Sequence, residues 1–322
     1  MDNDMIVTSC EPEQAFAPVV PTVPVVPTAP VVPTAPVAPA RPARPARPAD
    51  VGGAAARAEN APPQQRTARH DLPGLFDRQL GIPGFGPQAQ ERLSRATVLV
   101  AGIGGLGGAA ATYLAAAGVG RLVLVHPGVL EEPDLNRQTL MRPEWIGRSR
   151  VACAEQTLRA HHPGVEIVGY DRELADLPEL GQLVAAADVV VDARHNFPDR
   201  YRLNDLCVAT GTPAVIAAMN ATEGNVLVVE PGTPCLRCVF SEGDPTWEPL
   251  GFTVLGAVSG LAGCLAAMES IKIIARFGEP ASGRLLQYDL WDMDFRSMRV
   301  RSDPTCPSCA RARARRQPEE PR

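Results

Sequence analysis

The stretch Val98-Leu-Val-Ala-Gly-Ile-Gly-Gly-Leu-Gly-Gly108 joins a short apolar run to a cluster of glycines, and an alanine-rich segment at 109–117 follows it. The apolar run favours a buried strand, whereas the alanines favour a helix. A strand, a tight turn and a helix in this order aim free backbone N–H groups and the positive end of the helix dipole at an anion. The stretch therefore predicts a nucleotide-phosphate site, although tight packing of a strand on a helix would produce the same glycines.

Segments that favour strands and helices alternate after this stretch. We expect helices at 88–95, 151–161, 177–187 and 200–210, and strands at 121–125, 165–170, 188–192 and 214–218. Such alternation is typical of parallel βαβ units, which bind ligands beyond the carboxyl ends of their strands. Further strands, expected at 225–230, 284–289 and 295–300, resemble hairpin strands. We therefore predict an α/β fold with a doubly wound, Rossmann-like sheet and a C-terminal antiparallel extension.

The composition divides the chain into three parts. Residues 1–70 repeat Val-Val-Pro-Thr-Ala-Pro and then Ala-Arg-Pro, and prolines at this density favour a disordered, partly polyproline II tail. A solvated spacer is a simpler interpretation of this tail than a docking site for a proline-binding partner. Residues 71–310 have the length of one α/β domain, and residues 311–322 form a charged C-terminal tail.

Charge and hydropathy argue against nucleic-acid binding, secretion and a membrane span. The formal net charge is -5, and no long basic run lies within 71–310, which argues against nucleic acid as a partner. The chain opens Met-Asp-Asn-Asp without a basic start, so we expect a cytoplasmic protein rather than a secreted one. The apolar segment 253–277 also carries Glu269 and Lys272, which favours a buried core helix over a membrane span.

Two pairs of cysteines have the spacing of metal-binding turns. Cys235 and Cys238 form one Cys-x-x-Cys pair, and Cys306 and Cys309 form the other. Four thiolates on two such turns suit a closed, structural, tetrahedral zinc site that would hold the end of the chain onto the sheet. Two disulfides are the competing interpretation, which a cytoplasmic chain disfavours. Cys10, Cys153, Cys207 and Cys264 show no such pairing. The last three lie in expected helices and are interpreted as small core residues.

Taken in order, these features resemble the ThiF/MoeB/HesA family of ubiquitin-activating-type adenylyltransferases. The matching segments are Asp77-Arg-Gln79, 102–108, 116–120, Leu135-Asn-Arg-Gln-Thr139, 192–196, the two cysteine pairs and 267–272. The resemblance implies that Mg-ATP adenylates the C-terminal carboxylate of a ubiquitin-like sulfur-carrier protein, or of a related protein or peptide. Adenylation supplies a poor electrophile with a good leaving group, while cations offset the charge that builds on the phosphates.

The resemblance also assigns roles to individual residues. The turn glycines Gly102, Gly104, Gly105 and Gly107 would bind the phosphates, Arg137 would contact them, and Asn196 would face the nucleotide. Arg78 resembles an arginine that reaches into the site of a second subunit, which implies a homodimer. Arg150 occupies the position of the catalytic lysine, and the change preserves the charge but not the compact ammonium group.

Five further positions depart from the family pattern. His126 and Gly128 lie where an acidic residue would hold the ribose hydroxyls, and Asp134 replaces an asparagine and adds negative charge near the phosphates. In the family motif Asp-x-x-Asp-Asn, this chain reads Asp192-Ala-Arg-His195-Asn196, so His195 replaces the carboxylate that would bind magnesium. Arg194 and His195 are expected to make this part of the pocket cationic.

Two hypotheses follow. In the first, the protein is an adenylyltransferase with an altered way of holding ribose and metal. In the second, it is a degenerate member that acts as a zinc-stapled binding or scaffold protein without adenylation. A nicotinamide-dependent dehydrogenase fits worse, because it would leave the Asn-Arg-Gln motif and the cysteine pairs unexplained.

Overall fold

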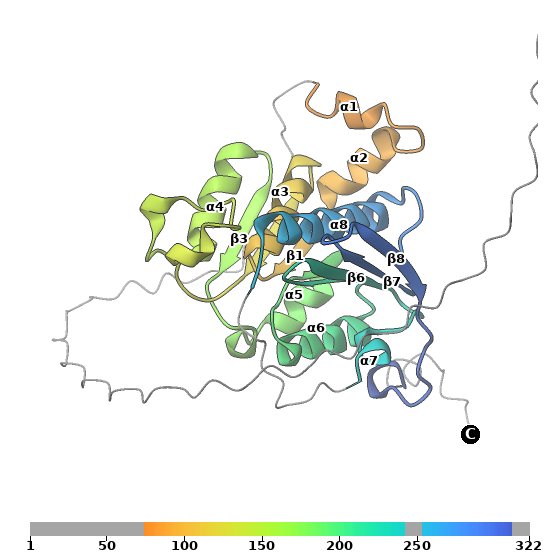
Figure 1. Ribbon diagram of the computed structural model, residues 1–322. Helices are drawn as coiled ribbons and strands as arrows, with labels where there is room; N and C mark the ends of the chain where they lie inside the picture. Colours follow the sequence, from red (N-terminus) through yellow and green to blue (C-terminus); the bar gives the residue numbers. More distant parts are fainter. Residues whose placement is uncertain (1–73, 242–252, 311–322) are drawn as a thin grey trace, which may run out of the picture. The chain divides into compact units, whose positions relative to one another are not determined.

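The computed structural model describes residues 74–241 and 253–310 (Figure 1). The expected tails at 1–70 and 311–322 lie outside these residues, as does the segment 242–252. Within the described residues the fold alternates strands and helices from β1 to β5, at residues 97–220, as the sequence predicted.

The described strands form one sheet in the order β3-β2-β1-β4-β5-β6-β7-β8. The first five strands in this order run parallel, and β6, β7 and β8 extend the sheet with antiparallel pairs. The strands are β1 (Thr97–Ala101), β2 (Arg121–Val125), β3 (Glu166–Tyr170), β4 (Val189–Asp192), β5 (Ala214–Asn220), β6 (Glu223–Val229), β7 (Arg284–Asp289) and β8 (Asp294–Arg299). This order confirms the doubly wound sheet and its antiparallel extension.

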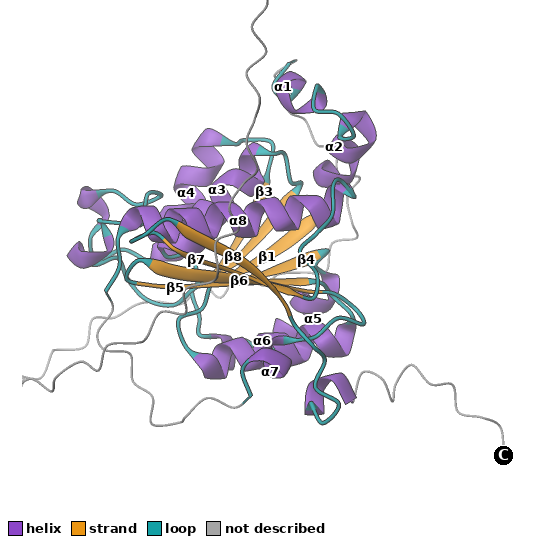
Figure 2. Cartoon of the chain, turned by 45° about the vertical axis from the view of Figure 1, so that its right-hand side comes forward, coloured by secondary structure: helices purple, strands orange, loops and turns teal. Residues whose placement is uncertain are grey.

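Helices cover both faces of the sheet (Figure 2). Side chains alternate between the faces of a strand, so Val98 and Val100 of β1 join one apolar cluster while Leu99 and Ala101 join the other. The first cluster includes residues of α2 (Gly86–Arg95), α3 (Gly105–Ala116), α4 (Arg150–His161) and α8 (Gly256–Ala275). The second includes residues of α5 (Leu180–Ala186), α6 (Phe197–Thr210) and α7 (Leu236–Val239).

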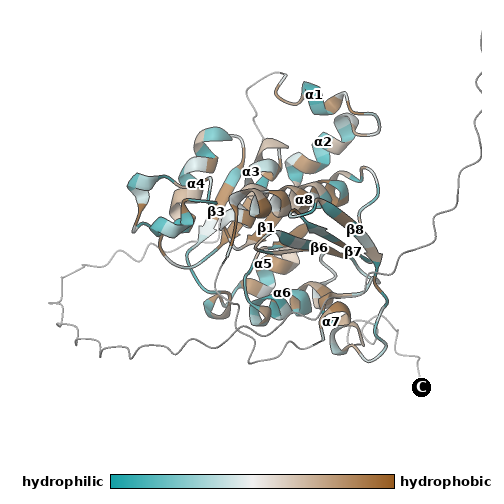
Figure 3. Ribbon diagram, in the orientation of Figure 1, coloured by the Kyte–Doolittle hydropathy of each residue, from teal (hydrophilic) through white to brown (hydrophobic). Residues whose placement is uncertain are grey.

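Helix α8 is long and apolar enough to cross a membrane by length and composition alone. Half of its apolar window is buried within the fold, where the helix packs against α3, α2 and strands β5 and β6. Figure 3 shows this hydrophobic helix lying along the sheet. Its packing is that of the core helix expected from the sequence.

Two helix boundaries differ from the expected ones for local reasons. The helix expected at 177–187 begins only at Leu180, because Pro178 holds the preceding Leu177 in an extended conformation. The helix expected at 200–210 begins three residues earlier, at Phe197. Asn196 caps its N-terminus with a side-chain hydrogen bond, and Pro198 fits the first turn.

The topology places the candidate site at the carboxyl ends of β1 and β4. These strands are neighbours, yet the chain leaves β1 toward β2 on one side and reaches β4 and β5 on the other. Ligands of doubly wound sheets bind at such a reversal of strand order. The glycine turn follows β1 here, and the segment 192–196 follows β4.

Candidate nucleotide site and cysteine cluster

The glycine turn after β1 has no room for a side chain at Gly102, Gly105 or Gly107. Gly102 has a φ of +98°, and a Cβ there would lie 2.5 Å from the carbonyl oxygen of Ala193. A Cβ on Gly107 would collide with the carbonyl of Gly102. Gly104 precedes α3 and provides no side-chain cap. Among the described residues, the first N–H groups of α3 therefore have no intrahelical or side-chain capping partner, which is the arrangement that binds anions.

The Asn-Arg-Gln segment packs directly against this turn. A Cβ on Gly105 would lie 2.9 Å from Cγ of Arg137, and a Cβ on Gly104 would lie 3.9 Å from Nε2 of Gln138. Gln138 is 3% exposed, and its Oε1 atom has no hydrogen-bond partner among the described residues. The structure thus brings together two motifs that lie 30 residues apart in the chain. The buried Gln138 was not among the predicted site residues.

Asp134 connects Arg137, which was assigned to the phosphates, with Arg150, which occupies the position of the catalytic lysine. Its carboxylate lies 3.0 Å from the Arg137 guanidinium and 3.7 Å from that of Arg150. The expected extra negative charge near the phosphates is therefore present, but two positive charges adjoin it. The sequence indicated each of these residues separately and gave no sign that they form one cluster.

His126, at the end of β2, contacts the glycine turn itself. Its Nδ1 atom accepts a hydrogen bond of 3.1 Å from the backbone N–H of Ile103. Burial, with the nearby Arg150 and Arg194, lowers the pKa of His126 to about 3. The imidazole is therefore neutral near pH 7, and its acceptor nitrogen is already engaged. This residue stabilises the turn in a way that sequence comparison with the family pattern did not reveal.

The segment after β4 does not have the cationic character expected from its sequence. The guanidinium of Arg194 is 2% exposed and forms ion pairs with Asp199 at 2.7 Å and Glu173 at 3.0 Å. Partial burial and the adjacent Arg194 lower the pKa of His195. Arg194 is thus neutralised by two carboxylates and His195 favours its neutral form, so the expectation of a cationic pocket here was wrong.

The carboxylates near the end of β4 do not suit a protein-bound magnesium ion. Asp192 is 1% exposed, one of its oxygens accepts the backbone N–H of Arg194, and burial raises its pKa despite the neighbouring Arg200. Asp199 and Glu173 are paired with Arg194. Magnesium binds carboxylate oxygens that it can reach with its waters attached, whereas these carboxylates are buried or already paired with arginines. The described residues here therefore do not form a magnesium cage.

Asn196 caps α6, and Arg78 lies far from the glycine turn of its own chain. Both polar atoms of the Asn196 amide bond Asp199 within the cap of α6. Arg78 is exposed on α1 (Asp77–Leu80), and the next residue, Gln79, bonds the carbonyl of Ala117 at the C-terminal end of α3. The 12 residues of α3 separate that end from the glycine turn by about 18 Å. Arg78 therefore lies too far away to reach the turn of its own chain.

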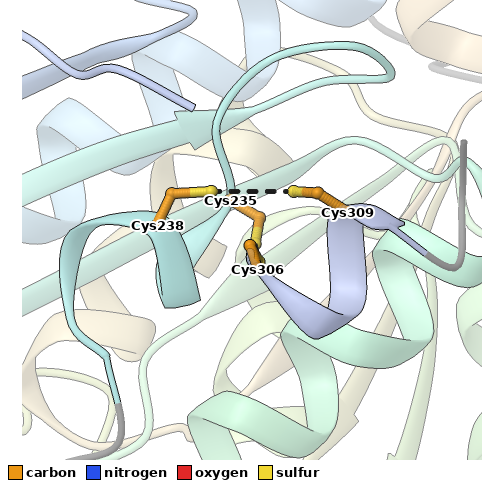
Figure 4. A group of neighbouring side chains, drawn as sticks. All are labelled: Cys235, Cys238, Cys306 and Cys309. Atoms are coloured by element: carbon orange, nitrogen blue, oxygen red, sulfur yellow. Dashed lines mark hydrogen bonds between the residues drawn. The ribbon is translucent and has the colours of Figure 1, made fainter. Parts of the chain in front are cut away.

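The four cysteines of the two pairs converge (Figure 4). Their Sγ atoms all lie within 4.8 Å of one another, with 3.6 Å between Cys235 and Cys306 and 3.7 Å between Cys238 and Cys309. All four are free thiols rather than disulfides. Zinc bonds of about 2.3 Å in a tetrahedron separate the sulfurs by about 3.8 Å. The donor set and its spacing therefore fit a zinc ion.

Asp205 of α6 links the turns that carry the two pairs. It forms a bidentate ion pair with Arg237, which lies inside the first pair, with both N–O distances 2.9 Å. It also accepts a hydrogen bond of 2.5 Å from the hydroxyl of Ser308, which lies inside the second pair. Arg237 and Ser308 together lower the pKa of Asp205, although its burial opposes this. Sequence spacing alone gave no indication of this contact.

The other described cysteines lie in helices as expected. Cys153 of α4 and Cys207 of α6 are buried, and burial raises the pKa of both thiols. Cys264 of α8 is half-buried, and its thiol pKa is raised for the same reason. High thiol pKa values disfavour a nucleophilic role. Cys10 lies outside the described residues.

Comparison with known proteins places this fold and site in a family. The model of the ThiF family matches residues 76–308. The chain belongs to the ThiF family. It is 48% identical to "Protein HesA, heterocyst" of Trichormus variabilis over 236 residues, which are 73% of this chain and 87% of that protein. It is 37% identical to the sulfur carrier protein adenylyltransferase of Thermus thermophilus, over 73% of this chain and 89% of that protein.

Solved structures support the same fold. A crystal structure of E. coli MccB with MccA-N7isoASN superposes with a TM-score of 0.66, at 21% identity, over 74% of this chain and 75% of that chain. At this identity the likeness concerns the fold alone. This chain and that solved structure therefore share the α/β fold.

Proposed function

We propose that this protein is an ATP-dependent adenylyltransferase that activates the C-terminal carboxylate of a ubiquitin-like sulfur-carrier protein or a related peptide. The observation that carries the proposal is the packing of Arg137 against the glycine turn at the carboxyl ends of β1 and β4. Free N–H groups and a guanidinium at one point are the chemistry that a triphosphate requires. One relative named as a sulfur carrier protein adenylyltransferase and another named as an adenylyltransferase and sulfurtransferase support the same activity.

The reaction would be an in-line exchange at phosphorus. A carboxylate oxygen of the carrier attacks the α-phosphorus of ATP, the bond to the bridging oxygen breaks, and pyrophosphate leaves with the bonding electrons. Arg137 and Arg150 would offset the charge on the phosphates, and the N–H groups of the turn would orient them. Magnesium would arrive bound to the triphosphate, without a carboxylate ligand from the end of β4.

A second copy of the chain would complete the site. Arg78 is exposed and lies near the end of α3 that faces away from the glycine turn of its own chain. We therefore propose a homodimer in which Arg78 of one copy serves the site of the other.

The four free thiols would hold zinc and fasten residues 306–309 to the sheet. Free thiols also agree with a reducing, cytoplasmic location.

Pyrophosphate exchange tests the proposal. The purified full chain should incorporate labelled pyrophosphate into ATP when a carrier protein ending in Gly-Gly is added. Arg137→Ala should abolish this exchange and leave zinc content unchanged, and its melting temperature should fall by no more than the loss of one ion pair to Asp134 explains. Arg142→Ala is the matched control, because Arg142 follows in the same segment and its side chain is 56% exposed. Exchange by Arg137→Ala at the wild-type rate would overturn the site assignment.

The alternative is a binding or scaffold protein that performs no adenylation. The observation that favours it is His195, which stands exposed at the end of β4 where the family pattern has a carboxylate. Calorimetry with ATP separates the two functions. The adenylyltransferase should bind ATP at micromolar to low millimolar concentration, more tightly with magnesium present. A protein that binds carrier but no ATP in either the presence or absence of magnesium would support the scaffold.

A further inference from the structure

Asp134 is a buried carboxylate held between two arginines. It ends the short 3-10 helix Glu132–Asp134 and is 6% exposed. Oδ1 lies 3.0 Å from Nη2 of Arg137, and Oδ2 lies 3.7 Å from Nη1 of Arg150. Oδ2 also accepts a hydrogen bond of 3.1 Å from the backbone N–H of Glu131, which anchors the carboxylate to its own loop.

The two arginines come from different elements and flank the glycine turn region. The stem of Arg137 lies against Gly105, and its guanidinium also donates to the carbonyl of Pro133 at 2.7 Å. Arg150 is the first residue of α4, and a Cβ on Gly128 would lie 3.1 Å from its Nη2 atom. Their side chains are only 13% and 23% exposed. Two guanidiniums this well buried would repel each other without an anion between them.

We infer that Asp134 is a positioning residue for the proposed adenylation, which this inference presupposes. Its carboxylate sets the separation of Arg137 and Arg150 and offsets one of their two charges before the nucleotide binds. The arginine side chains are thus preorganised for the triphosphate and need not change rotamer during the reaction. Neutralising Asp134 should therefore impair the chemical step, whereas ground-state ATP binding gains from the loss of a negative charge near the phosphates.

The test compares Asp134→Asn with Glu132→Gln, an exposed acid on the same 3-10 helix whose substitution removes the same charge. Asp134→Asn should lower kcat of carrier-dependent pyrophosphate exchange about tenfold or more, since misplaced groups lose rate steeply. Its Kd for ATP by calorimetry should equal or improve on the wild-type value. Glu132→Gln should match the wild type in both. A weaker Kd with unchanged kcat in Asp134→Asn would overturn the inference.

A double-mutant cycle on kcat separates a positioning role from a merely structural one. If Asp134 acts through Arg150, Asp134→Asn should reduce kcat little further in an Arg150→Ala background. Independent, multiplying effects would overturn the inference. If Asp134→Asn does not fold, Asp134→Glu takes its place, since it keeps the charge but displaces it by one methylene. It should show the same loss of kcat with retained ATP binding, and wild-type kcat would refute the inference.

A failure of the proposed function gives a different result. Wild-type protein that binds no ATP and exchanges no pyrophosphate with any carrier would refute the adenylyltransferase itself. Active wild-type protein with an equally active Asp134→Asn variant would refute only the positioning role.

Discussion

The position of the glycine turn depends on how closely helix α8 approaches helix α3, and Gly263 tests this. A Cβ on Gly263 would lie 2.7 Å from Cβ of Ala109, 3.0 Å from the backbone nitrogen of Ala110, and closer still to the carbonyl oxygen of Leu106. These are mainly backbone atoms of α3, so a rotamer change cannot relieve the contact. Gly263→Ala should therefore push the two helices apart.

The expected magnitude follows from two opposing terms. Overpacking a tight core contact costs about 1–3 kcal/mol, whereas replacing a helical glycine by alanine gains about 0.5–1 kcal/mol. The packing term should win here, because Gly263 is buried and the clash involves backbone. At about 2–4 °C per kcal/mol for a domain of this size, the melting temperature should fall by about 3–6 °C. ATP affinity should fall as well, because α3 carries the glycine turn at its N-terminus.

Gly260→Ala is the matched control on the same helix, one turn earlier. A Cβ there meets nothing within 4 Å, so only the helix-propensity gain remains and the melting temperature should rise or stay level. Differential scanning fluorimetry of both variants, with and without ATP, measures the contrast. The reasoning is refuted if Gly263→Ala melts at or above the wild-type temperature, because the helices would then have room that the structure denies them.

Three further predictions concern the cysteine cluster and His126. Cys306→Ser should lower zinc content, measured by mass spectrometry, and the melting temperature together, because structural zinc binding is part of folding; full stability with no metal in either form would contradict the zinc site. Asp205→Asn should keep stoichiometric zinc but release it to a chelator about tenfold faster or more, since groups that orient ligands change metal affinity 10–100-fold; unchanged release would show that Asp205 does not hold the two turns. The unfolded chain protonates His126 near pH 6.5 but the native state only near pH 3, so the unfolded state binds more protons between these values. The free energy of unfolding should therefore decrease by up to about 1.4 kcal/mol per unit as pH falls from 6.5. His126→Asn should show a shallower decrease in urea titrations at several pH values, and an identical slope would exclude His126 as the cause.

The alternation of strands and helices and the two principal motifs could be predicted from the sequence because their signals are local. The apolar run at Val98, the glycines after it and the alternation of strands and helices each occupy adjacent residues. The convergence of the cysteine pairs was also predictable, because two Cys-x-x-Cys turns next to strands suit one tetrahedral ion. The ends of helices were harder to predict, because a periodic pattern of apolar residues does not show the capping by Asn196 or the dihedral restriction that Pro178 imposes.

The electrostatics of the site could not be predicted, because the charges that matter are paired across the chain. Arg194 reads as an added cation in sequence, but its partner Glu173 lies 21 residues away on the loop after β3. Asp134 reads as an added anion, but Arg150 reaches it from α4. A residue considered without its partner therefore suggests the wrong net charge for the site. Only the folded arrangement shows which charges remain available to a ligand.

This pairing bears on whether the altered site is degenerate. A buried charge without a partner costs several kcal/mol, so random loss of site residues would leave destabilising groups that the fold must tolerate. Here the departures from the family pattern are compensated in place: Asp134 lies between two arginines, and the guanidinium of Arg194 is shared by two carboxylates. His126 occupies the position of a lost acid and bonds the glycine turn in its neutral form. Compensation at Asp134, Arg194 and His126 favours a site maintained for a ligand over one in decay, and the ligand that its N–H groups and arginines suit best is a triphosphate.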